Sequence, residues 1–146
     1  MLHSTRPTNF SPRFEVVSCF FICDDRFLLL HRQDDVKLER NKWGLPAGKK
    51  GKKETELEAM MREVEEETGL KLSKPKFKQH HTLYVRYPEY DFIYYPFRAN
   101  FHEEPEITLN PQEHKEYRWV TPEEALKMKL VRDMDECIKV FFKRGE

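Results

Sequence analysis

The sequence has few cysteines, no excess of charge of either sign, no internal repeat and no long apolar run. Its three cysteines lack zinc-ligand spacing, which argues against a disulfide framework or a zinc site and favours reduced thiols in a cytoplasmic protein. The 26 basic residues balance the 26 acidic ones, so the net charge predicts no stable nucleic-acid partner. No stretch approaches the ~20 apolar residues of a membrane span, and we expect no membrane association.

The chain is rich in phenylalanine and tyrosine, which predicts a packed core and argues against disorder. At 146 residues it is long enough for one core without disulfides or structural metals. We therefore expect a single domain over residues 1–146, in which residues 1–12 form a polar N-terminal arm. Expected strands and helices intermix along the chain, which is typical of a layered α/β domain.

The apolar patterns predict the individual elements. Residues 14–25 and 26–33 are expected to form a hairpin that turns at Asp24 and Asp25, with strands covered on both faces. A helix is expected over residues 55–68, with Gly69 as its C-terminal cap. Further strands are expected over 74–87, 91–101 and 116–120, and helices over 121–128 and 134–143. Pro96 suggests that its strand lies at an edge or carries a bulge.

The expected helix over residues 55–68 is unusually acidic. Its core-facing stripe should consist of Leu57, Met61, Val64 and Thr68, with Met60 at the flank. Glu63, Glu66 and Glu67 are spaced i, i+3 and i+4, so they share a neighbouring arc and repel one another. Oxygen ligands on one helical face suit Mg²⁺ or Mn²⁺. The alternative is a solvated acidic face with local ion pairs.

The residues around this helix favour the metal-binding interpretation. Gly48, five residues, Glu54, seven residues and then the run from Arg62 to Leu70 match the pattern G-x5-E-x7-R-E-U-x-E-E-x-G-U at every specified position. With this complete Nudix box, the chain resembles the Nudix hydrolase family. The stretches WGLPAG and EHKEYRWVTPEEAL are similar to the usual flanks of that family. The resemblance implies an α/β/α sandwich with a mixed sheet, in which the box forms a loop, a helix and a loop.

The resemblance also implies roles for individual residues. Glu66 and Glu67 match the principal ligands of a Mg²⁺ or Mn²⁺ ion, and Glu63 matches a further ligand or the base that activates water. Arg62 and Glu54 match positions that orient these carboxylates, and Ala47 matches one whose backbone carbonyl joins the metal shell. Many members use another glutamate from a distant loop as ligand or base. Glu113 is the candidate here, and Glu116 is the substitute.

Three residues are candidates for substrate binding. Arg32 follows a strand and could hold a phosphate, although an ordinary surface arginine is an equal alternative. Lys49 opens a loop with four lysines, which could attract a polyphosphate or simply remain solvated. Tyr94 belongs to an aromatic run that could stack a nucleobase or only pack in the sheet. The lysine-rich loop at residues 49–53 also departs from the family pattern, since many relatives have an acidic residue and a glycine directly before the glutamate that matches Glu54.

Family members mostly hydrolyse a nucleoside diphosphate linked to a further group, X. The resemblance therefore implies a metal-dependent hydrolase that cleaves a phosphoanhydride bond, with a (d)NTP or related nucleotide as the first candidate substrate. ADP-ribose and dinucleoside polyphosphates are alternatives within this class. A non-catalytic nucleotide-binding module is an alternative of another class, but such modules usually lose box glutamates that are all present here. The oligomeric state stays open between monomer and homodimer.

Overall fold

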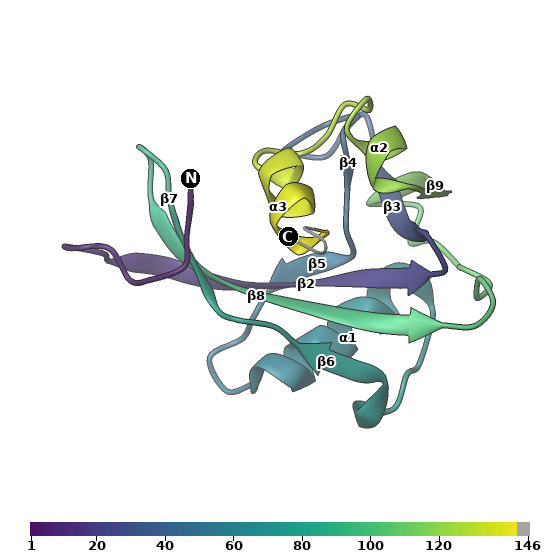
Figure 1. Ribbon diagram of the computed structural model, residues 1–146, viewed down its shortest axis with the longest axis horizontal. Coiled ribbons are helices and arrows are strands. Elements are labelled where there is room, and N and C mark those ends of the chain that lie inside the picture. The colour runs from purple at the N-terminus through teal and green to yellow at the C-terminus, as the bar shows by residue number, and fades with distance from the viewer. Residues whose placement is uncertain (143–146) are drawn as a thin grey trace.

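The structure is a computed structural model that describes residues 1–142. Its strands join in one sheet (Figure 1) and are β1 Leu2–His3, β2 Pro12–Cys23, β3 Arg26–Arg32, β4 Trp43–Gly44, β5 Ala47–Lys49, β6 Phe77–Gln79, β7 Leu83–Arg86, β8 Asp91–Phe101 and β9 His114–Val120. The helices are α1 Glu56–Thr68, α2 Pro122–Ala125 and α3 Met134–Phe141, and one 3-10 turn spans Lys74–Lys76.

The sheet is mixed, as expected. Its path runs β1-β7-β8-β2-β3-β4, while β5 pairs with β2, β6 with β8 and β9 with β3. The two longest strands, β2 and β8, are parallel, and the other ladders are antiparallel. Strand β3 pairs with β2 only at Ile22 and Cys23, and β5 occupies the edge of β2 from Val16 to Ser18. Gly48, the first residue of the Nudix box, therefore lies within the sheet.

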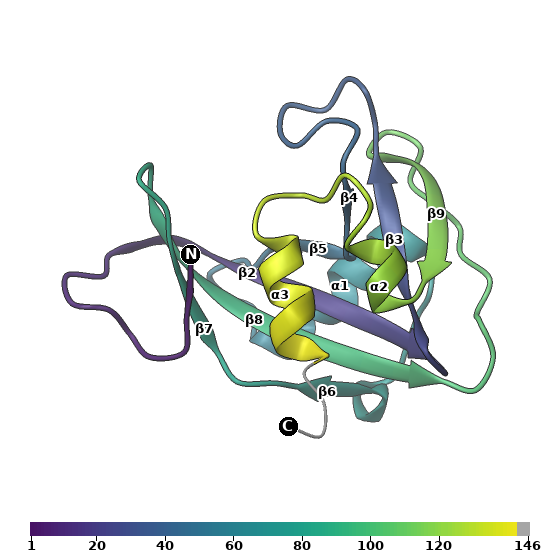
Figure 2. The same ribbon diagram turned by 45° about the horizontal axis from the view of Figure 1, so that its top comes forward.

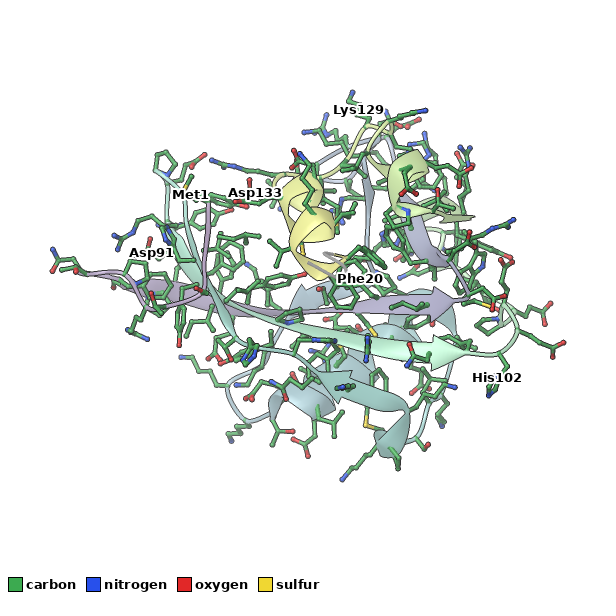
Figure 3. The ribbon with its side chains drawn as sticks, in the orientation of Figure 1. Met1, Phe20, Asp91, His102, Lys129 and Asp133 are labelled. Carbon is green, nitrogen blue, oxygen red and sulfur yellow. The ribbon has the colours of Figure 1, made fainter. Side chains whose placement is uncertain are left out.

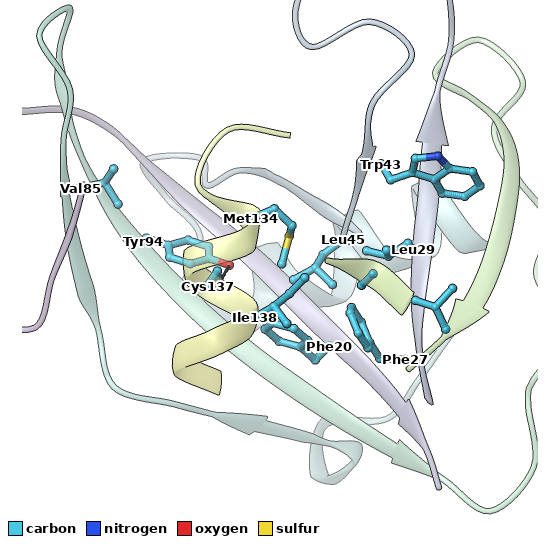
Figure 4. Packing of buried hydrophobic residues seen from close by; sticks show 12 residues of the cluster. Phe20, Phe27, Leu29, Trp43, Leu45, Val85, Tyr94, Met134, Cys137 and Ile138 are labelled. Carbon is cyan, nitrogen blue, oxygen red and sulfur yellow. Dashed lines mark hydrogen bonds between the residues drawn. The ribbon is translucent and has the colours of Figure 1, made fainter. Parts of the chain in front are cut away.

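Helices cover both faces of the sheet. Helix α1 lies on one face, and α2 and α3 lie on the other (Figures 1 and 2). Side chains of β2 alternate between the two layers, because Cys19 and Phe21 pack in the cluster beneath α1 while Phe20 packs in the cluster beneath α3. Figure 4 shows the second cluster, and Figure 3 shows Phe20 between the sheet and α3. The predicted α/β/α sandwich, with strands covered on both faces, is confirmed.

The local signals placed most elements correctly. The hairpin turns at Asp24 and Asp25, and α1 begins after Thr55 and ends at Gly69. The expected strand over 74–87 is instead divided into the 3-10 turn, β6 and β7. This division follows from pairing, since β6 and β7 contact different parts of β8. The last helix ends at Phe141, and residue 143 of its predicted range lies outside the described residues.

The predicted core-facing stripe of α1 is confirmed for Val64 and Thr68, which are fully buried, but it placed Met60 and Met61 wrongly. Met60 is fully buried, whereas Met61 is only partly buried. The buried face also includes Glu63 and Glu67, because it packs against β5 of the sheet as well as against apolar side chains. Tertiary contact with the start of the box therefore sets the rotation of the helix.

Pro96 does not lie in an edge strand or at a bulge, contrary to the prediction. It lies inside β8, paired in register with Ser18 of β2. On the other side of β8 it faces the gap between β6 and β7, where its carbonyl accepts a hydrogen bond from the His80 amide at 2.9 Å. Since a strand residue directs its nitrogen and its carbonyl to the same side, the missing N–H of proline leaves no ladder bond unmade.

The N-terminal segment lies against the sheet. Leu2 and His3 pair with Val85 and Tyr84 of β7, and Phe10 is buried. No helix within residues 1–142 is both long and apolar enough to cross a membrane.

Candidate active site

Both ends of α1 are held by local hydrogen bonds. The Thr55 hydroxyl accepts from the Glu58 amide at 3.1 Å, and the Glu58 carboxylate accepts from the Thr55 amide at 2.9 Å, which forms a capping box. At the other end, Gly69 adopts φ 75° and its amide donates to the Glu65 carbonyl at 2.9 Å. These caps fix the helix that presents Glu63, Glu66 and Glu67.

Gly48 provides the room that Glu63 occupies. A Cβ atom at position 48 would lie 2.1 Å from the carboxyl carbon of Glu63, far inside van der Waals contact. Glycine therefore lets the Glu63 carboxylate lie directly against the backbone of β5. The glycine at the start of the box thus has a spatial explanation.

Glu67 is the more deeply buried of the two inward-facing carboxylates. It is 4% exposed and its Oε1 atom accepts from the Ala47 amide at 3.0 Å. Burial raises the pKa of Glu67 well above its usual range, and the charges of Glu63 and Glu113 add to the rise. Burial also raises the pKa of Glu63, against the opposing effect of Arg62. The positive charge of Arg62 therefore does not offset the burial of these two adjacent carboxylates.

Arg62 is the cation that holds the other carboxylates. It binds Glu54 through two hydrogen bonds, from Nε at 2.6 Å and from Nη2 at 2.9 Å. Its Nη1 group donates to Glu63 at 2.8 Å and to Glu66 at 3.3 Å. Nη2 also donates to the Lys49 carbonyl at 3.1 Å. The Arg62 guanidinium chiefly lowers the pKa of Glu54 to about 2, so this pair stays charged and positions its neighbours.

The donor set fits a hard divalent cation. Arg62 pairs with Glu54, Glu63 and Glu66, and the buried Glu67 lies beside Glu63. One guanidinium among four carboxylates leaves excess negative charge and oxygen donors that Mg²⁺ or Mn²⁺ prefer. Within the described residues, no three such side chains already converge on one point. The reason is local: Glu63 points at Gly48 and Arg62, while the side chain of Glu66 is 52% exposed. Glu66 would have to change its side-chain rotamer to bind the same cation as Glu67.

A cavity of about 610 Å³ opens beside Glu67, Ala47 and Gly48. Aromatic side chains form much of its wall, and the three substrate-binding candidates also line it: Phe14, Tyr87, Tyr90, Phe92, Arg32, Lys49 and Tyr94. Its lining residues come from many elements and loops, among them β2, β5, β8 and α3. Figure 4 shows four of them, Val85, Tyr94, Met134 and Cys137. The cavity therefore joins an acidic end to a largely apolar interior.

The three candidates differ in how free their polar groups are. Arg32 donates from Nε to the Leu38 carbonyl at 3.1 Å. The ammonium of Lys49 lies 4.4 Å from the ring centre of Phe14, in a cation–π contact. The Tyr94 hydroxyl lies within hydrogen-bond reach of Ser18 and of the Cys137 thiol, so only its ring is available to a ligand.

The two distant-loop candidates lie in different surroundings. Glu113 raises the pKa of Glu67 through its charge, which places it near the acidic cluster, and it accepts from Asn110 at 3.1 Å. Glu116 instead hydrogen-bonds the His31 ring at 2.8 Å. Of the two candidates, Glu113 is the one whose charge acts on Glu67.

Parts of the cavity wall had no sequence signal. Phe14, Arg132 and Met134 come from segments far apart in the chain, and only the tertiary fold joins them. His114 also lines the cavity and is 3% exposed. Burial, together with the charges of Arg32 and His31, lowers the pKa of His114 to about 4, so its ring is neutral near pH 7. In the sequence, its position next to Glu113 is the signal that could have placed His114 near the site.

Comparison with known proteins identifies relatives of this chain. The chain is 31% identical over 117 residues to mouse (Mus musculus) bis(5'-nucleosyl)-tetraphosphatase [asymmetrical], covering 77% of this chain and 76% of the mouse protein. The crystal structure of a MutT protein from Methanosarcina mazei Go1 matches with a TM-score of 0.77 and 26% identity, over 93% of this chain and 97% of that one.

A further match is a bifunctional NMN adenylyltransferase/ADP ribose pyrophosphatase from Francisella tularensis, complexed with AMP and a Mn ion. Its TM-score is 0.73 at 22% identity, over 93% of this chain and 43% of that one, which shows a shared fold. The family model of the NUDIX domain matches residues 12–141, a range that contains the acidic helix, Gly48 and the cavity walls from β2 to α3. The chain therefore belongs to the Nudix family of hydrolases.

Proposed function

We propose that the protein is a divalent-metal-dependent hydrolase that cleaves a phosphoanhydride bond of a nucleoside diphosphate linked to a further group. One observation supports this above the others. Glu63 and Glu67 are buried side by side against Gly48 and Ala47, next to Arg62, and Glu67 opens into the cavity. Buried carboxylates without balancing charge are costly unless they bind a cation.

The residues present divide the work between binding and proton transfer. Glu66 and Glu67 are the proposed principal ligands of Mg²⁺ or Mn²⁺, with the Ala47 carbonyl and Glu113 as further oxygen donors. The bound ion would neutralise phosphate charge and make water more acidic. Arg62 and Glu54 keep the carboxylates in place through their bidentate pair.

Glu63 is the proposed general base, because burial raises its pKa and a more basic carboxylate accepts a proton from water more readily. The water oxygen then bonds to phosphorus while the bridging oxygen leaves with the second phosphate. Glu113 is the second candidate for this role. Arg32 and Lys49 are proposed to hold phosphate oxygens, and the ring of Tyr94 to contact the rest of the nucleotide in the cavity.

The first candidate substrate is a (d)NTP or related nucleotide, split into a monophosphate and pyrophosphate. A dinucleoside polyphosphate is the second candidate, and the 31% identity to the mouse tetraphosphatase supports it. ADP-ribose belongs in the same test. The proposed partner is thus a small nucleotide, and the three buried free cysteines are in keeping with a cytoplasmic location.

A substrate panel tests the proposal directly. The purified chain would be incubated with (d)NTPs, oxidised nucleotides, diadenosine polyphosphates, ADP-ribose and 5'-triphosphate RNA, each with Mg²⁺ and with Mn²⁺. Product analysis would identify the bond that breaks. We expect metal-dependent release of a nucleoside phosphate from at least one compound. Nucleotide binding without any turnover would instead favour the non-catalytic module.

A further inference from the structure

His114 is a buried histidine in the cavity wall whose Nδ1 atom has no hydrogen-bond partner within residues 1–142. The residue is 3% exposed, at the first position of β9. Ala47, Glu67 and Arg32 line the same cavity. Buried polar atoms without a partner are rare in folded proteins, because each costs the hydration it has lost. An imidazole retained only for packing would be better replaced by an apolar side chain.

The local strand geometry turns this residue inward. In the β3–β9 ladder His31 pairs with Glu116, but the next residue, Arg32, pairs with His114. Lys115 is therefore the extra residue of a β-bulge, and it is exposed and bound to Asp34 at 2.6 Å. Bulges redirect side chains and are common beside active sites. Here the bulge places His114 and Arg32 opposite each other at the cavity.

The chemistry of these two neighbours defines the group they could bind. Arg32 uses its Nε for the Leu38 carbonyl, and its terminal Nη groups are the part that can reach another acceptor. An imidazole can donate one further N–H. The charged guanidinium of Arg32 and the imidazole of His114 are two donors that suit an anionic oxygen. Both residues line the cavity that Glu67 also lines. A phosphate held at that cluster would present such oxygens.

We propose that His114 is a substrate-binding residue that, together with Arg32, donates a hydrogen bond to a non-bridging phosphate oxygen of the nucleotide held beside Glu63 and Glu67. This inference rests on the proposed function and adds a specific phosphate contact to it. The bond forms with the substrate in place and supplies the partner that the imidazole lacks in the free protein.

Two substitutions at position 114 separate hydrogen bonding from packing. His114→Leu removes the donor at similar volume, and His114→Gln retains a side-chain N–H. For the best substrate of the panel, we expect His114→Leu to raise KM about tenfold or more, and His114→Gln to recover most of that loss. His80→Leu is the matched control, because His80 also has a buried unpartnered nitrogen but packs on Phe141 and does not line the cavity. Its KM should equal that of the wild type.

A direct measurement on the unmodified chain removes dependence on the variants' folding. In ¹⁵N-histidine NMR spectra, adding ADP with Mg²⁺ should move the ring resonances of His114, assigned from the His114→Gln spectrum, and leave those of His80 in place. Turnover by the wild type combined with an unchanged KM in His114→Leu, or an unmoved His114 signal when ADP binds, would overturn this inference alone. If the wild type shows neither turnover nor ADP binding, the proposed function is overturned together with the inference about His114.

Discussion

Gly48 has no side chain at the place where Glu63 needs room for its carboxylate, and this is one of the contacts that connect β5 to α1. The atom in the way of a Cβ is the far end of a flexible side chain, so a substitution would displace the carboxylate rather than the backbone. At the scale of the residue, the site can therefore lose its geometry while the fold survives.

The substitution Gly48→Ala tests that separation. We expect kcat to fall by about a hundredfold, because displacing a catalytic carboxylate by about 1 Å can cost that much. The melting temperature should change by only a few degrees. The kcat and the melting temperature would be measured on the same preparation of each protein. In a Glu63→Ala background the same change should add little further loss, since the two residues act through one contact. An additive loss would show that Gly48 acts elsewhere.

Glu66 is the exposed member of the acidic cluster, and its neighbour Glu65 is exposed as well. Glu66→Gln keeps the shape of the side chain and removes its charge. We expect turnover with Mg²⁺ to fall at least about a hundredfold if Glu66 is a metal ligand. Glu65→Gln, one position along the same helix, should stay near the wild-type rate, and both should melt as the wild type does. Near-normal turnover of Glu66→Gln would reject the ligand assignment.

At the scale of elements, helix α1 shows what local sequence can predict. Its boundaries followed from Thr55 and Gly69, because caps act within one turn of the chain. Its buried face followed only in part: Val64 and Thr68 were predicted correctly, but the buried carboxylates Glu63 and Glu67 look polar in a periodicity count and their contacts lie in β5. Similarly, the segment 74–87 has strand-like composition, but its partner β8 decides where pairing breaks. Tertiary contacts override local preference in both cases.

The Thr55 cap makes a measurable contribution to this element. Thr55→Ala removes the acceptor for the Glu58 amide and should lower the free energy of unfolding by about 1 kcal/mol. Thr55→Ser keeps a hydroxyl acceptor and should lose only a small part of this. Urea titrations would compare the three proteins. Thr55 follows Glu54, but the Glu54 carboxylate is held by Arg62 and by the Gly51 amide rather than by the cap, so kcat at low temperature should be unchanged. A large loss would show that the cap also positions the site.

At the scale of the whole molecule, the cavity is assembled from segments that the sequence keeps far apart. The carboxylates of α1 lie in one continuous stretch of sequence, so they could be named from the sequence, and their binding of a metal stays a prediction. The walls come from many segments, among them β2, β5, β8 and α3, and the parallel pairing of β2 with β8 brings two of these together. Substrate-binding candidates such as Arg32 could be named individually, but their common cavity required the fold.

Arg86 holds the N-terminal segment onto this assembly. It donates to the Thr8 and Asn9 carbonyls at 3.0 and 2.9 Å and pairs with Asp91 at 3.1 Å. Arg86 and the Ser11 amide lower the pKa of Asp91, so the pair stabilises the fold above the ordinary pKa of aspartate. That contribution is lost as the pH falls through the lowered value. Leu2, which pairs with β7, also lines the cavity.

Arg86→Ala should therefore loosen the N-terminal segment without unfolding the sandwich. We expect faster hydrogen exchange at the amides of residues 2–11, with protection in the centres of β2 and β8 unchanged, because those strands pair independently of Arg86. Asp91→Asn should produce a smaller change in the same residues, since the two carbonyl bonds of Arg86 persist. Lowering the pH below the Asp91 pKa should loosen the wild type but affect Asp91→Asn less. Equal exchange in all three proteins at neutral pH would show that β1 alone holds the segment.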